Sequence, residues 1–63
     1  MTVRTLIRKL HIPETEKIYI SQEISPIATL VVIGSRHSST VNKKAMSRVK
    51  GFSHRNGYLQ ISL

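Results

Sequence analysis

The longest apolar run in the chain covers residues 27–33, is rich in β-branched side chains and ends at Gly34. A short unbroken run of this kind is typical of a strand covered on both faces, because a strand covered on one face alternates apolar with polar residues. The run is far shorter than the roughly 20 apolar residues that a membrane-spanning helix needs. It therefore predicts a strand at or near the centre of a small sheet, around which the other elements are arranged.

The length of 63 residues indicates one small domain over residues 1–63. A chain of this size buries only about 60% of the surface that its unfolded form exposes, so its stability is expected to be marginal. It has no cysteine, which excludes disulfides and thiolate metal sites. Self-association is another way to gain buried area, and a homodimer is one expectation that follows.

Charge is the strongest compositional signal. Ten Lys and Arg residues face three acids, all of them between residues 14 and 23, and the net charge is +7. Residues 24–63 therefore carry only positive charges, and such a region attracts nucleic acid or another polyanion. The charge of a basic protein can also serve solubility alone. Arg and Lys interrupt the apolar residues of the N-terminus, so no signal peptide is expected, and we expect an intracellular protein that does not bind membranes.

The first half of the chain predicts a helix and a strand before the apolar run. Apolar residues at helical spacing favour a helix over residues 3–10, capped by Thr2, although a strand over residues 3–12 fits the same composition. Pro13 ends this element and is expected to hold residues 11–12 extended. Residues 14–16 are expected to form an exposed turn. Residues 17–21 alternate, which places Ile18 and Ile20 inward.

The second half predicts a helix and a hairpin. Residues 41–50 place apolar side chains on one side of a helical wheel and basic ones on the other, with Gly51 as the residue that ends the helix and Phe52 folding back onto Met46. Asn56-Gly57 is the strongest short hairpin signal. A two-residue turn there pairs Arg55 with Tyr58, His54 with Leu59, Ser53 with Gln60 and Phe52 with Ile61.

These elements predict an α+β fold in the order α-β-β-α-β-β, with a three- to four-stranded sheet and two short helices. If the first element were a strand instead, the sheet would be larger. The apolar strand, the second helix and a later parallel strand are expected to form a crossover connection.

The candidate binding residues lie in the second half of the chain. The polar loop that follows Gly34 opens a helix, where backbone amides, hydroxyls and cations favour an anion, but the loop lacks the spacing of a nucleotide-binding P-loop. The basic side of the second helix and an outward Arg–Tyr pair on the hairpin add to this surface. The predicted nucleic-acid-binding residues are Arg36, Ser38, Ser39, Thr40, Lys43, Lys44, Arg48, Arg55 and Tyr58.

Catalysis is not expected. The three histidines are widely separated and lack metal-ligand spacing, no Asp is present to orient a His-Ser pair, and the few acids make a magnesium-dependent nuclease centre an unfavoured interpretation. His54 is interpreted as a half-buried residue of the sheet. No metal or cofactor is predicted.

The sequence thus favours a small nucleic-acid-binding protein that contacts the phosphate backbone of DNA or RNA, in a regulatory or accessory role. The alternative is a protein-interaction module, an inhibitor or adaptor, that docks its basic face or a sheet edge on an acidic protein.

Overall fold

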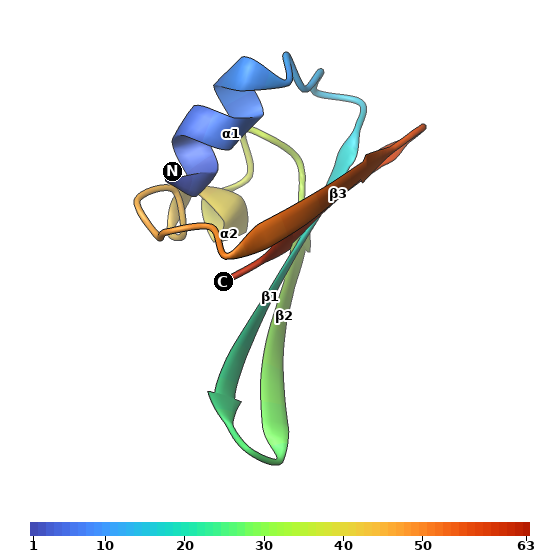
Figure 1. Ribbon diagram of the computed structural model, residues 1–63. Coiled ribbons are helices and arrows are strands. Elements are labelled where there is room, and N and C mark those ends of the chain that lie inside the picture. Colours follow the sequence, from blue (N-terminus) through green and yellow to red (C-terminus); the bar gives the residue numbers. More distant parts are fainter.

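The structure, a computed structural model that describes residues 1–63, contains two short helices and a four-stranded mixed sheet (Figure 1). The α+β class and the predicted element order are confirmed. The elements are α1 (Val3–Lys9), β1 (Lys17–Ser25), β2 (Ala28–Gly34), α2 (Ser39–Asn42), β3 (Gly51–Arg55) and β4 (Tyr58–Ser62). Neither helix has the length and apolar composition needed to cross a bilayer.

The sheet consists of two hairpins laid side by side. Its strand order is β2-β1-β4-β3, in which the β1–β2 and β3–β4 pairs are antiparallel and the central β1–β4 pair is parallel. The prediction that the apolar run lies at the centre is therefore wrong, because β2 is an edge strand. Only Val32 and Gly34 in β2 are even half-buried. β2 and β3 do run in the same direction, but they lie at opposite edges instead of side by side.

Both helices cover the same face of the sheet. The core consists of nine buried residues: Val3, Leu6, Ile7, Ile12, Ile18, Ile20, Val41, Leu59 and Ile61. Ile18 and Ile20 of β1 point inward as predicted, and they pair with Leu59 and Ile61 of the parallel strand β4. The opposite face of the sheet has no helix over it (Figure 1).

The first element is a helix, with Thr2 as its N-cap accepting a hydrogen bond from the Thr5 amide. At its C-terminus, His11 adopts a left-handed conformation with φ of 51°, which contradicts the expectation that it is extended. The amides of His11 and Ile12 donate to the carbonyls of Arg8 and Ile7, which is the Schellman closure of a helix. Pro13 restricts only the residue directly before it, so Ile12 alone is subject to that effect.

The second predicted helix is mostly absent. α2 ends at Asn42, and the backbone that follows forms turns instead of the helix predicted over residues 41–50. The carbonyls of Ala45 and Ser47 accept hydrogen bonds from the amides of Arg4 and Val3 in the first turn of α1. A helix over residues 41–50 would use the Ala45 carbonyl internally, so the Arg4 amide of α1 competes with it. Gly51 consequently begins β3, and Met46 is 73% exposed instead of contacting Phe52 as a helix-ending pair.

The C-terminal hairpin has the predicted register throughout, from Arg55 opposite Tyr58 to Phe52 opposite Ile61. Gly57 supplies the positive φ, 94°, that a tight turn of this kind requires. Leu59 and Ile61 are buried, but Phe52 on the same face is 47% exposed because β3 lies at an edge.

The β1–β2 hairpin extends well beyond the helices (Figure 1). β1 continues to Ser25, four residues past the predicted strand, with a register shift between Glu23 and Ser25. We call residues 22–31 the arm. Its large apolar side chains, Ile24, Ile27, Leu30 and Val31, are all exposed.

Candidate functional site

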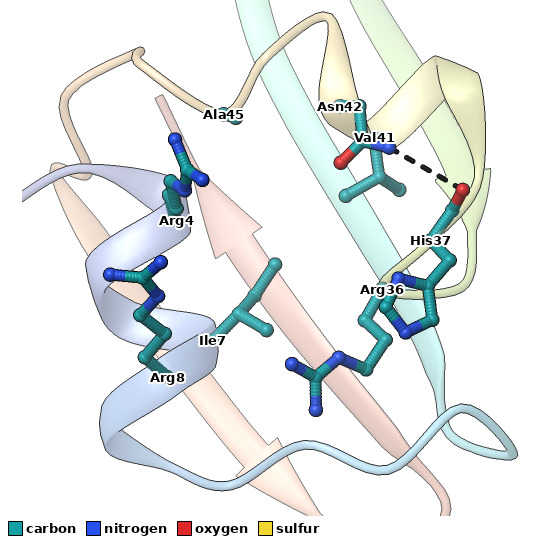
Figure 2. A pocket seen from close by; sticks show the side chains of 8 residues that line it. All are labelled: Arg4, Ile7, Arg8, Arg36, His37, Val41, Asn42 and Ala45. Carbon is teal, nitrogen blue, oxygen red and sulfur yellow. Dashed lines mark hydrogen bonds between the residues drawn. The ribbon is translucent and has the colours of Figure 1, made fainter.

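Three arginine side chains line one pocket on the helix-covered side of the molecule. Arg4 and Arg8 project from α1, one turn apart, and Arg36 faces them from the loop between β2 and α2 (Figure 2). The pocket has a volume of about 410 Å³. Its remaining lining residues are Ile7, His37, Val41, Asn42 and Ala45.

The local fold holds Arg36 in place. Its Nη1 donates a hydrogen bond of 2.9 Å to the carbonyl oxygen of Ile12, directly after the closing turn of α1. A guanidinium carries five N–H donors, so most of its hydrogen-bonding capacity stays available for a ligand. Ile7 and Val41 are buried core residues that form the apolar part of the pocket wall. The pocket therefore combines a fixed arginine with two exposed ones on a helix.

None of the three arginines that line this pocket is paired with an acid. No carboxylate lines it. Two of the glutamates contact histidines instead: Glu14 lies 3.0 Å from Nε2 of His37, and Glu16 lies 2.7 Å from Nε2 of His54. None of the ten Lys and Arg residues is paired with a carboxylate. Unpaired guanidinium groups around a concave surface favour an anionic ligand.

The hydroxyls of the loop are mainly structural. Ser38 is the N-cap of α2, accepting from the Val41 amide and donating to the Ser35 carbonyl at 3.0 Å. A side chain at Gly34 would collide with the Ser38 hydroxyl, so the glycine permits this close approach. The Thr40 hydroxyl lies 3.3 Å from that of Ser38, whereas Ser39 is exposed. The Ser38 hydroxyl is thus occupied by hydrogen bonds that stabilise the loop and the helix, whereas the Ser39 side chain is accessible to a ligand.

The predicted lysines and Arg48 follow α2 without lining the pocket. Lys44 is half-buried and its Nζ donates to Gln22 Oε1 at 3.0 Å, which ties this turn to β1. Lys43 and Arg48 are exposed, and the backbone of Arg48 pairs with that of Thr2 ahead of α1. These cations therefore extend the basic surface beyond the three arginines.

Arg55 and Tyr58 lie elsewhere, on the face of the sheet that has no helix over it. They are cross-strand partners, as predicted, and the Tyr58 ring meets that of Tyr19 edge to face, with ring centroids 5.6 Å apart. The predicted site residues are thus divided between two faces of the molecule. Any nucleic acid that contacted both sets would have to wrap around an edge of the sheet.

Sequence reasoning missed Arg4 and Arg8. They precede the acid-containing segment, and the sequence pattern indicated no binding role for them. Their spacing of four residues on one helix face was the available signal. What it could not reveal is that the loop holding Arg36 packs opposite that face, which depends on the tertiary fold.

A second pocket, of about 360 Å³, surrounds the His54–Glu16 pair. Glu16 was predicted to lie in an exposed turn, but its side chain is only 9% exposed and is bonded to His54. His54 itself is a partly exposed residue of the sheet, with 35% of its side chain accessible. No cluster of three or more His, Cys, Asp or Glu side chains that could hold a metal ion is present.

Comparisons with protein-family models, with curated proteins and with solved structures found no match to this chain.

Proposed function

We propose that this protein binds nucleic acid through the phosphate backbone, with the arginine pocket of Arg4, Arg8 and Arg36 as the principal contact. The observation that carries the proposal is the convergence of three arginines, none paired with a carboxylate, on one pocket. The role is one of binding, regulatory or accessory in character, and not of catalysis.

The chemistry of arginine supports a phosphate ligand. The planar guanidinium matches two phosphate oxygens with two parallel N–H donors, which an ammonium group does not do. The net charge of +7 adds a long-range attraction that favours a polymer of phosphates over a single small anion. Lys43, Lys44 and Arg48 would contact further phosphates along the same strand. Ser39 and Thr40 would supply hydroxyl donors.

The test is a fluorescence-anisotropy titration of duplex DNA, single-stranded DNA and RNA at several salt concentrations. The parent protein should bind with an affinity that falls steeply as salt rises. Arg8→Ala should lower the log–log salt slope for duplex DNA by about 0.9, and Arg4→Ala with Arg8→Ala by about twice that. Arg8→Lys should recover the slope but not the full affinity, because it keeps the charge and loses the paired donors.

Lys9→Ala is the matched control. Lys9 is adjacent to Arg8, is exposed and carries the same charge, but it does not line the pocket. The control should therefore bind more tightly than Arg8→Ala. Equal losses in the two variants would mean that bulk charge and not the pocket governs binding. Absence of binding by the parent at low salt would contradict the proposed function itself.

Arg55→Ala and Tyr58→Ala test whether the open face of the sheet takes part. Tyr58 is half-buried against Tyr19, so a base could stack only on its accessible part. If these two variants weaken binding to single strands more than to duplex, the open face contacts bases.

The alternative function, docking on an acidic protein, predicts a different result for the parent protein. It should have no affinity for nucleic acid, and it should retain a protein from lysate even after nuclease treatment.

A further inference from the structure

The β2 edge of the sheet is unprotected. β2 pairs only with β1, so the backbone groups along its other side have no partner in the sheet. Proteins usually protect such an edge with charged residues, Pro, a bulge or a very short strand. β2 is seven residues long, has no charged residue and no Pro, and its register with β1 is continuous from Gly34 to Thr29.

The opposite edge is different. β3 has five residues, of which the exposed His54 and Arg55 are polar or charged. Its first residue is Gly51, which adds no side chain. Only one of the two edges is therefore suited to accept another strand.

Apolar side chains flank the β2 edge on both faces of the sheet. Leu30 pairs with Gln22 on the helix-covered face, whereas Val31 and Ile33 pair with Ser21 and Tyr19 on the open face. All three are at least 40% exposed. A strand added at this edge would cover apolar side chains on both faces of the sheet. This burial would stabilise the pairing in addition to the main-chain hydrogen bonds.

The distribution of charge indicates which kind of partner would pair with the β2 edge. All ten Lys and Arg residues lie outside residues 18–35, where Glu23 is the only charged side chain. Lys44, whose Nζ donates to Gln22 Oε1 on β1, brings a cation beside this segment, which otherwise gives an acidic protein or a nucleic acid little to bind. Two copies of this chain, each with a net charge of +7, repel one another least where they meet through a segment without Lys or Arg. The hairpin also projects away from the two helices (Figure 1).

We propose that two copies of this chain associate through antiparallel pairing of their β2 strands about a two-fold axis. Residues directly opposite in an antiparallel ladder share one hydrogen-bonding class, so the axis must pass beside a single residue. Val31 is the middle residue of β2, and centring there pairs all seven residues: Val31 with its own copy, Leu30 with Val32, and Thr29 with Ile33. The two four-stranded sheets become one continuous sheet.

The first test measures mass by sedimentation equilibrium over a range of concentrations. The parent should approach twice the 7.1 kDa of one chain. Val31→Lys places two like charges opposite one another at the axis and should raise the dissociation constant at least about 100-fold. Ile27→Lys is the matched control, because it adds the same charge in the turn beside β2 at a residue that is 96% exposed, and it should stay dimeric.

The second test uses the absence of cysteine from the chain. Val31→Cys should form a disulfide-linked dimer on mild oxidation, because the two Cα atoms would lie about 5 Å apart. Thr29→Cys should not, because its copy would lie roughly 13 Å away along the strand. Circular dichroism of each variant checks that the fold is retained.

A monomeric parent at millimolar concentration would overturn the proposal, and so would a dimer that Val31→Lys leaves intact. Cross-linking of Thr29→Cys in place of Val31→Cys would contradict the register. A monomeric chain that instead captures the strand of another protein would overturn it as well. Loss of the dimer with unchanged affinity for DNA separates this interface from the arginine pocket.

Discussion

The two ends of the β1–β2 hairpin carry similar apolar residues, but these are buried at one end and exposed at the other. At the helix-covered end, Ile18 and Ile20 are almost completely buried under α1 and α2. In the arm, Ile24 has the same side chain on the same strand, yet it is 64% exposed. Burial here depends on which elements cover the strand and not on residue type. One end contributes the buried core of the domain, and the other leaves its apolar side chains exposed.

The largest effect should come from truncating the same residue at the two ends. Ile20→Ala removes a side chain that is 1% exposed and should lower the free energy of unfolding by about 2–5 kcal/mol. Ile24→Ala, on the same strand, should change it by less than about 0.5 kcal/mol. Chemical denaturation followed by circular dichroism measures both. Equal losses in the two variants would mean that the arm is packed as tightly as the core.

The next effect comes from comparing the two His–Glu pairs, one of which is partly buried and the other exposed. His54→Ala should cost about 1–3 kcal/mol, because it leaves the buried Glu16 carboxylate without its hydrogen-bond partner. His37→Ala breaks an exposed pair with Glu14 and should cost less than about 0.5 kcal/mol. Thermal unfolding at a fixed pH compares them. A reversed order would show that the 2.7 Å contact adds no stability.

A smaller effect is expected at the cap of α2. Ser38→Ala removes the acceptor for the Val41 amide and should lower the free energy of unfolding by about 1 kcal/mol. Ser39→Ala alters an exposed serine one residue later and is the control. Urea titration of the two variants should show a clear difference in midpoint. Similar midpoints would mean that the fold does not depend on this cap.

The smallest effect is a gain in stability. His11 has a left-handed conformation, with φ of 51°, at the end of α1. His11→Gly should raise the free energy of unfolding by about 0.5–1 kcal/mol, because glycine adopts this conformation without steric cost. His11→Ala keeps the strain and should give no gain. A loss of stability in the glycine variant would show that the histidine side chain makes a compensating contact.

The parts of the fold that depend on residues close together in the sequence were predictable from it. Asn56-Gly57 fixes the register of the β3–β4 hairpin, and the apolar spacing after Thr2 fixes α1 and its cap. The class and the order of elements follow from the same local signals. Local signals could not distinguish a central strand from an edge strand, because an apolar run has the same composition in both places.

The parts that depend on distant contacts were not predictable. The helix predicted over residues 41–50 stops at Asn42 because α1 takes the carbonyl of Ala45. The same packing brings Arg4 and Arg8 opposite Arg36, so only Arg36 of the three was predicted from the sequence as a binding residue. Glu16 is buried for a related reason, since its partner His54 is 38 residues away.

The parallel pairing at the centre of the sheet has a consequence for how the chain folds. Each hairpin joins strands that are close in sequence, whereas the central contact joins Ile18 to Leu59. Bringing together segments that far apart carries an entropic cost that is met before the contact is gained, so rates fall as such pairings dominate. We expect the hairpins to form early and their alignment to limit the folding rate, which makes this chain slower to fold than a helical bundle of equal length.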